Sequence, residues 1–345
     1  MDPFTQILLG AAVGHATLGA RVGRKALFWG AVFGGMPDLD VLLPHPDAVA
    51  AVTNHRGFSH SLVTHTIVAP FLGAGLAGLH AREGASVARW TLLVWLALAT
   101  HALLDAITIY GTQLFWPSTV PPVGLGSIFI IDPLYTLLLL VGVLWAALAR
   151  RKPTVGRHAN RVGLGLSTAY LAGAIFIQAQ VRDIAERELA RQGVAYDRLM
   201  TTPTPFNLLL WRVVAMVPNG YREGYYSLLD PLPEIRFVAY PSDESLFSTV
   251  DDAPTVTRLR WFTRGFYRVR EIDGRLEITD LRMGFEPRYI FSFVVAHRQE
   301  GVIRPLITPE RVPAERPDAE ALRWVWRRML GEKNGTDPNS PAEQP

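Results

Sequence analysis

Seven ionisable residues near the start of the chain have the types and the spacing of a metal site. They lie in three short segments: Asp38 and Asp40 in P-D-L-D, His55, Arg56 and His60 in N-H-R-G-F-S-H, and His101 and Asp105 in H-A-L-L-D. His101 and Asp105 are four residues apart, so on a helix they share one face. Ionisable groups inside an apolar run are costly and usually mark a function with a partner nearby. We therefore predict that the three segments converge on one metal site at a membrane surface.

The chemistry of these side chains limits which metal they would hold. The chain contains no Cys, so thiolate ligands are excluded. Imidazole and carboxylate ligands suit Zn²⁺ best here, and also Mn²⁺ or Fe²⁺. The predicted ligands are Asp38, His55, His60, His101 and Asp105. Because this set is larger than a single catalytic zinc needs, either two ions bind or some of these residues orient the ligands.

A divalent metal ion held by these His and Asp side chains predicts a hydrolase. A two-metal site would activate water and stabilise both oxygens of a phosphoester displacement. Arg56 could then hold a phosphate oxygen, and Asp40 could act as the general base. Two structural alternatives stay open: a hydrogen bond between His101 and Asp105 that joins packed helices, and a surface position for Arg56, paired with lipid phosphate or Asp47. The sequence has no G-x-S-x-G, P-loop or G-x-G-x-x-G motif for serine hydrolysis or nucleotide binding.

Long apolar runs surround these segments and indicate a membrane protein. Of the 345 residues, 49% are hydrophobic and 19% charged, and nearly all the long apolar runs lie between residues 5 and 181. Six runs are candidate membrane helices: 5–20, 26–43, 62–80, 90–109, 128–149 and 162–181. The last four approach the 20 or so residues that a span needs. The first two are short and rich in Gly and Ala, which favours a helical hairpin packed closely on the others. A large soluble helical bundle is the alternative.

Basic residues are distributed unevenly between the loops. Loops 21–25, 81–89 and 150–161 carry ten Lys and Arg residues, whereas 44–61 and 110–127 carry only Arg56. The positive-inside rule places the basic loops in the cytoplasm. The candidate metal site and everything after residue 181 would then lie outside the cytoplasm. The net charge of +3 is mild, and it gives no argument for a nucleic-acid partner.

The remainder of the chain is typical of a soluble α+β domain. Strands are predicted at 208–217, 221–229, 235–240, 259–272, 275–283 and 289–297. Hairpin turns at Asn219-Gly220 and Asp273-Gly274 favour one antiparallel, meander-like sheet. A basic amphipathic helix is expected at 318–330. The predicted fold is thus a mostly α membrane protein with about six transmembrane helices in residues 1–181, a smaller α+β domain at 182–330, and a disordered tail at 331–345.

Two helix starts are predicted from local signals. Asp132-Pro133 is typical of an N-cap followed by Pro in the first turn of a helix. Ser59, next to His60, is expected to cap the helix that begins near Ser61.

Several segments together resemble one protein family. M-D-P-F-T-Q-I-L-L-G at 1–10, P-D-L-D at 37–40, H-R-G-F-S-H-S at 55–61, H-A-L-L-D at 101–105 and Y-G-T-Q-L-F-W-P at 110–117 are similar to the YdjM-like bacterial inner-membrane proteins, which are described as metal-dependent hydrolases. The resemblance covers residues 1–150, and segments 202–212 and 224–230 resemble the longer members with a C-terminal extension. Asp38, Asp40, His55, His60, His101 and Asp105 match the motif positions. Gln6 departs from the His of many members, and His15 from an acidic residue.

The resemblance and the residues together predict a hydrolase bound to the bacterial inner membrane by several spans. Its substrate would be a phosphoester such as a phospholipid at the outer face, and its partners would be membrane lipids. Two alternatives remain. One is a non-enzymatic membrane protein with a structural metal or polar cluster and a partner-binding C-terminal domain. The other is a transporter in which His101 and Asp105 relay a proton or cation. Neither paired broken helices nor an inverted repeat supports the transporter.

Overall fold

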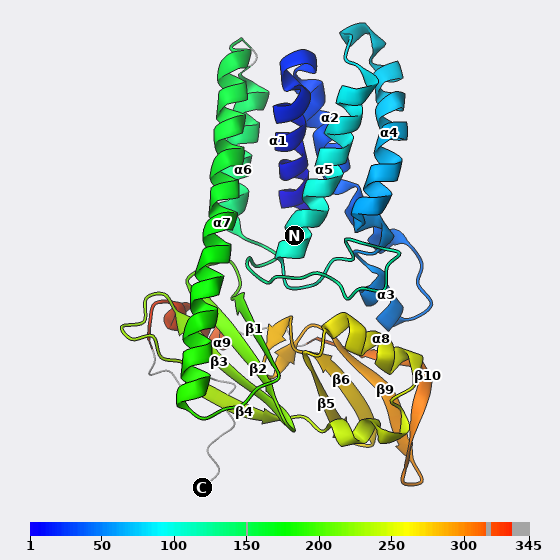
Figure 1. Cartoon of the computed structure of the whole chain (residues 1–345), viewed down its shortest axis with the longest axis vertical. Helices are drawn as coiled ribbons and strands as arrows, with labels where there is room; N and C mark the ends of the chain where they lie inside the picture. Colours follow the sequence, from blue (N-terminus) through cyan, green and yellow to red (C-terminus); the bar gives the residue numbers. More distant parts are fainter. Residues whose placement is uncertain (150, 315–318, 333–345) are drawn as a thin grey trace. The chain divides into compact units, whose positions relative to one another are not determined.

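The chain folds into two compact units. The computed structural model describes residues 1–149, 151–314 and 319–332 (Figure 1). Residues 1–43 and 54–175 form the first unit, which is helical, and residues 44–53 and 176–345 belong to the second. The division falls inside one long helix, α7 (Pro153–Arg191), rather than in a linker.

The helical unit contains the helices expected from the apolar runs. In chain order these are α1 (Pro3–Val22), α2 (Arg24–Gly35), η1 (Pro37–Leu42), η2 (Phe58–His60), α4 (Leu62–Leu79), η3 (Ala81–Glu83), α5 (Val87–Ile107), α6 (Pro133–Leu148) and the first part of α7. Among the described residues, three helices are long and apolar enough to cross a membrane, namely α4, α5 and α7, and α6 is a shorter apolar helix. The predicted run at 26–43 is divided, because Pro37 begins a separate 3₁₀ turn.

Glycines allow α1 and α2 to pack as the predicted close hairpin. Gly10 and Gly14 on α1 face Gly30 and Gly34 on α2. A Cβ added at Gly34 would lie 2.6 Å from the carbonyl oxygen of Gln6 and 2.8 Å from Cα of Gly10, so only glycine permits this backbone approach. Figure 1 shows the two helices side by side. The close approach brings the end of α2 next to the start of α1.

Helix α5 is the centre of the helical unit, whereas the outer helices expose apolar side chains. Trp90, Leu93 and Val94 of α5 are fully buried. On α4, by contrast, Phe71 is 75% exposed and Ile67 is 60% exposed. Contiguous apolar exposure of this kind is rare on soluble proteins. It therefore argues against the soluble-bundle alternative and for contact with lipid.

One of the two predicted helix starts is confirmed. Asp132 accepts a hydrogen bond from the backbone N–H of Tyr135 at 2.9 Å, and Pro133 is the first residue of α6. The prediction for Ser59 is wrong. Ser61 is the N-cap of α4, because its hydroxyl accepts from the backbone N–H groups of Val63 and Thr64. Ser59 lies two residues before this cap in the sequence.

The second unit contains antiparallel sheets, as predicted, but its described residues form two four-stranded sheets and a two-stranded pair rather than a single sheet. The first sheet has the order β1-β2-β3-β4 and the second has the order β10-β9-β6-β5. The strands are β1 (Arg198–Pro203), β2 (Leu210–Val217), β3 (Gly220–Ser227), β4 (Phe237–Pro241), β5 (Tyr267–Ile272), β6 (Arg275–Asp280), β9 (Ser292–Gln299) and β10 (Val302–Val312), with a small pair, β7 (Gly284–Phe285) and β8 (Arg288–Tyr289). Both predicted hairpin turns are confirmed: they join β2 to β3 and β5 to β6.

Helices complete the second unit. They are α3 (Ala48–Asn54, with residues 44–53 in this unit), η4 (Glu244–Thr249), α8 (Pro254–Thr263) and α9 (Ala319–Met329), together with the last part of α7. Helix α9 confirms the prediction for 318–330, although its first predicted residue lies outside the described residues. The predicted strand at 259–272 is wrong in its first half, because α8 continues to Thr263. Most of the predicted disordered tail, from residue 333 on, also lies outside the described residues.

Candidate metal centre

Three elements of the helical unit bring four candidate ligands together. Asp38 comes from η1, His60 from η2, and His101 and Asp105 from α5. As predicted, His101 and Asp105 share one face of their helix, and their side-chain atoms Nε2 and Oδ2 are 3.4 Å apart. Backbone hydrogen bonds hold the surrounding loops in place: Leu62 donates to Leu114, and Gln113 donates to Arg56. The four residues therefore meet at the end of the unit where α4 begins and α5 ends.

The distances between the four side chains are those of ligands around one ion. His60 Nε2 lies 3.0 Å from His101 Nε2 and 3.1 Å from Asp105 Oδ2. Asp38 Oδ1 lies 3.5 Å from both imidazole Nε2 atoms. Ligands about 2.0–2.1 Å from a tetrahedral zinc are separated from one another by about 3.3–3.4 Å. These separations lie near that value, and one ligand atom from each of the four residues lies within 4.8 Å of the others, so the group could hold one ion.

Hydrogen bonds at the Nδ1 atoms of His101 and His60 determine how the two imidazole rings are oriented. His101 Nδ1 lies 2.6 Å from the carbonyl oxygen of Gly34, so Nδ1 carries the proton and donates it. Ser59 donates its hydroxyl proton to Asp40 Oδ2 at 2.6 Å and therefore accepts from His60 Nδ1 at 2.9 Å. The two Nε2 atoms face each other at 3.0 Å, so as neutral imidazoles they would present two lone pairs that repel each other. A cation between them removes this repulsion.

Buried carboxylate oxygens without hydrogen bonds also indicate a site for a cation. Asp105 Oδ2 and Asp38 Oδ2 are both buried and have no hydrogen-bond partner in the described structure. Arg56 Nε lies 3.3 Å from Asp105 Oδ2 and offsets part of its charge, whereas a buried carboxylate oxygen without a partner, such as Asp38 Oδ2, is costly. Metal coordination would satisfy Asp105 Oδ2 directly, because that atom faces both imidazoles. Asp38, His60, His101 and Asp105 thus form a group that could hold a metal ion.

Comparison with known proteins shows the family of the chain. Residues 1–181 match the family described as YdjM inner membrane protein, which is more than half of the chain. The chain belongs to the YdjM inner membrane protein family. It is 26% identical over 299 residues to the uncharacterized protein YfhP of Bacillus subtilis strain 168, covering 80% of this chain and 86% of YfhP. It is also 36% identical over 101 residues to the inner membrane protein YbcI of Escherichia coli strain K12, covering 29% of this chain and 57% of YbcI. No solved structure matches the chain.

All four grouped residues of this YdjM-family protein lie in the matched region. Family membership and the apolar helices together indicate a membrane location. The second unit, with its two sheets, lies almost entirely beyond the matched residues. YfhP, which aligns over most of the chain, extends past that boundary and so must contain part of the same extension.

In this family member, His55 is placed outside the group of four. Its Nδ1 lies 2.7 Å from Asp40 Oδ1, and its side chain is 21% exposed. Asp40 also accepts from the hydroxyl of Ser59 and, at 3.1 Å, from the backbone N–H of Arg56. Asp40 therefore connects His55 to His60 through Ser59. Ser59 thus links Asp40 to His60 instead of capping a helix as predicted, and no local sequence signal indicated this role.

Arg56 is buried beside the group rather than exposed. It is 4% exposed, and its Nε lies 3.3 Å from Asp105 Oδ2. The guanidinium donates to the hydroxyl of Thr108 at 3.0 Å and lies 4.8 Å from the ring centre of Tyr110. The surface alternative, with Asp47 as partner, is therefore wrong.

Gln6, which stands where many family members have His, contacts one of the four grouped residues and its helix. Its side-chain amide donates to Asp105 Oδ1 at 3.0 Å and to the carbonyl oxygen of His101 at 3.2 Å. Asp105 Oδ1 also pairs with the amino group of Met1. Gln6 thus supports a ligand and leaves the group of four complete without a further His. No local pattern in the sequence indicated the contact with Met1.

His65 and His15 lie outside the group of four. His65 Nε2 lies 2.8 Å from the carbonyl oxygen of Ser59, which supports the loop that holds His60. His15 is buried in α1, where it interacts electrostatically with Arg157 and Arg161.

Proposed function

We propose that this YdjM-family protein is a metal-dependent hydrolase of the inner membrane that acts on a phosphoester, with a phospholipid as the favoured substrate class. Asp38, His60, His101 and Asp105 would hold the metal. The observation that carries the proposal is the close approach of the Nε2 atoms of His60 and His101, 3.0 Å apart and grouped with two carboxylates.

Zinc is the metal that suits this donor set best. Two imidazoles and two carboxylates without a thiolate are ligands of Zn²⁺, and the separations between them support tetrahedral coordination. When bound, a zinc ion would supply a water molecule of lowered pKa as the nucleophile. Asp38 is the ligand at the open side, because its side chain is 13% exposed whereas those of the other three are fully buried.

The residues around the ligands would supply the general base and stabilise the developing negative charge. His55 would take the proton from the attacking water, and Asp40 would orient its ring through the 2.7 Å contact with Nδ1. His55, rather than Asp40, would thus act as the general base, because Asp40 already contacts His55 Nδ1. Arg56, held beside Asp105, would stabilise the negative charge that develops on the phosphoryl oxygens. Asp40 would also position His60 through Ser59.

The proposed topology places the metal centre at the outer face and the second unit outside the cytoplasm. Within the helical unit, the loops after α1 and α4 are neighbours, because Lys25 pairs with Glu83. These loops lie at the opposite ends of α1, α4 and α5 from the candidate metal centre and carry Arg21, Arg24 and Arg82. The positive-inside rule supports a cytoplasmic position for them. In this topology α1, α2 and α6 would accompany the three long apolar helices across the membrane.

Elemental analysis of the purified protein tests the proposal. Wild type, prepared without chelators and reloaded with Zn²⁺, should contain about one metal per chain. The double variant His60→Ala/His101→Ala should lose it, and the control His158→Ala, an exposed residue of α7, should keep it. Hydrolysis of phosphodiester and phospholipid substrates should follow metal content. Metal-free wild type after reloading, or full metal in the double variant, would refute the metal centre.

A structural metal is the second candidate, and the number of ligands favours it. Four protein ligands complete a tetrahedral zinc site, as in structural sites, whereas catalytic sites keep one position open. Replacing the metal with Co²⁺ separates the two candidates. If inorganic phosphate changes the visible spectrum of the Co²⁺ protein, an open position exists and the hydrolase is supported. An unchanged spectrum together with no turnover would support the structural metal.

A further inference from the structure

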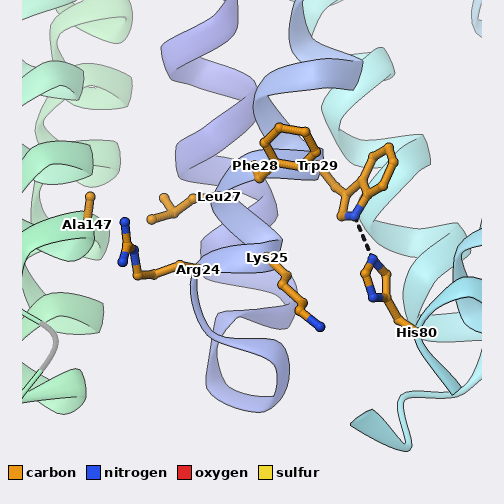
Figure 2. Close-up of a pocket in the computed structure, with 7 residues that line it drawn as sticks. All are labelled: Arg24, Lys25, Leu27, Phe28, Trp29, His80 and Ala147. Atoms are coloured by element: carbon orange, nitrogen blue, oxygen red, sulfur yellow. Dashed lines mark hydrogen bonds between the residues drawn. The ribbon is translucent and has the colours of Figure 1, made fainter. Parts of the chain in front are cut away.

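A second site lies at the end of the helical unit away from the metal centre. A pocket of about 470 Å³ opens there and is lined by Arg24, Lys25, Leu27, Phe28, Trp29, His80 and Ala147, called here the Arg24 pocket. Figure 2 shows Arg24 and Leu27 extending toward Ala147 of α6, while Trp29 reaches toward His80 at the end of α4. The pocket thus surrounds the outer surface of the first turns of α2.

The base of the pocket is packed from small and aromatic side chains. Leu27 is buried against Ala146 at the contact of α2 with α6, where small side chains leave space. On the other side, the indole N–H of Trp29 donates to His80 Nε2 at 2.8 Å, and the His80 ring stacks on Trp90 at a centroid distance of 5.2 Å. Phe28 between them is 60% exposed. This wall is apolar and faces outward from the helical unit.

The charge at the mouth of the pocket is positive and unbalanced. Lys25 pairs with Glu83, but in the part of the chain that the structure describes no acidic side chain pairs with Arg24. Glu83 is also the only acidic residue in the sequence segments 16–36, 76–92 and 144–161, which contain ten Lys and Arg residues. A free guanidinium beside an apolar wall at a membrane surface matches a ligand with an anionic head and an apolar tail.

We propose that the Arg24 pocket binds an anionic phospholipid, with its phosphate at Arg24 and one acyl chain along Leu27 and Phe28. Basic pockets between membrane helices are known to hold acidic lipid head groups, and a guanidinium is well suited to bidentate contact with phosphate. This lipid is a bound partner rather than the substrate of the metal centre, because the site lies at the other end of the helices. The proposal does not depend on hydrolase activity.

Lipid binding by delipidated protein in a neutral detergent tests this proposal. Native mass spectrometry would count bound phosphatidylglycerol and bound phosphatidylcholine for wild type, Arg24→Gln, Phe28→Ala and the control Arg89→Gln, an exposed basic residue at the same end. Wild type should prefer phosphatidylglycerol by about fivefold or more, the contribution expected of one basic residue at a membrane surface. Arg24→Gln should lose that preference, Phe28→Ala should weaken both lipids, and Arg89→Gln should match wild type.

Four outcomes would overturn the proposal. The first is equal binding of both lipids by wild type, a result that does not depend on whether any variant folds. The second is an Arg24→Gln variant that keeps its metal content and elution profile and still binds phosphatidylglycerol as wild type does. The third is displacement of the lipid by inorganic phosphate alone, which would make the pocket a site for free phosphate. Loss of phosphatidylglycerol in His60→Ala/His101→Ala would instead place that lipid at the metal centre and also count against the Arg24 pocket.

Discussion

Gly34 connects the packing of α1 and α2 to the metal centre, so a methyl group added there should disturb both. In Gly34→Ala the new Cβ would lie 2.6 Å from the carbonyl oxygen of Gln6 and 2.8 Å from Cα of Gly10. Both are backbone atoms that no side-chain rotation can move. An ordinary contact begins at 3.4 Å, so the two helices must separate locally by about 0.8 Å.

The size of the effect follows from two opposing terms. Overpacking of a tight contact costs about 1–3 kcal/mol, whereas replacing Gly by Ala inside a helix contributes about 1 kcal/mol of stability. We expect Gly34→Ala to lower the free energy of unfolding by about 0–2 kcal/mol. The carbonyl oxygen of Gly34 also accepts the Nδ1–H of His101. Displacing this partner should weaken metal binding by about 10-fold to 100-fold.

A matched control separates the contact from the substitution. Gly75 lies in α4, and a Cβ added there would meet nothing within 4 Å. Gly75→Ala should keep metal affinity and be equal to wild type or up to about 1 kcal/mol more stable. Thermal unfolding in detergent would measure stability, and competition with a chelator would measure metal affinity. Equal stability and equal metal affinity in the two variants would refute the close α1–α2 contact and its link to His101.

Three further predictions concern other buried contacts. Ser59→Ala should weaken metal binding by about 10-fold to 100-fold, because His60 Nδ1 loses its acceptor; chelator competition measures this, and unchanged affinity would contradict the role of Ser59. Arg212→Met should destabilise the second unit by about 3–5 kcal/mol in chemical unfolding, because Glu223, 2.6 Å from Arg212, stays buried with its charge unpaired. Adding Glu223→Gln should restore part of this loss, and no recovery would argue against the ion pair as its cause. Arg264→Gly should stabilise the second unit by about 1 kcal/mol, because Arg264 has a positive φ of 56° and its Nε is buried without a partner. Burial and the nearby charge of Arg282 lower the pKa of Arg264 to about 10, so this gain should be full below pH 10 and shrink as the wild-type guanidinium loses its proton at higher pH.

Local patterns determined much of the helical unit and part of the site. The apolar runs indicated where most of the helices lie, although the run 26–43 divides at Pro37 and α7 extends beyond its run at both ends. The spacing of His101 and Asp105 fixed their common face, because that geometry depends only on the helical repeat. The two hairpin turns were predictable for the same reason: Asn219-Gly220 and Asp273-Gly274 form their turns from adjacent residues.

Local sequence predicted the strands of the second unit less completely. Strand β10 pairs with β9 along an exposed edge, and it contains Pro305 and Pro309, so its local signal is weak. Residues 259–263 have a strand-like composition but continue the helix that Pro254 begins. The division into two sheets could not be predicted either, because local strand patterns do not determine which strands become neighbours.

The identity of the grouped ligands was decided only by tertiary structure. The sequence named five metal ligands, and packing brings four of them together while His55 pairs with Asp40. That outcome depends on where η1 and η2 end relative to α5, and the α1–α2 glycine contact sets the position of α2 and hence of η1. The contacts of Ser59 with His60 and of Gln6 with Asp105 likewise depend on how separate segments pack. Residue type and spacing thus determined which chemistry the sequence could suggest, and the packing of separate helices decided which side chains could share one ion, because ligands must meet within a few ångströms.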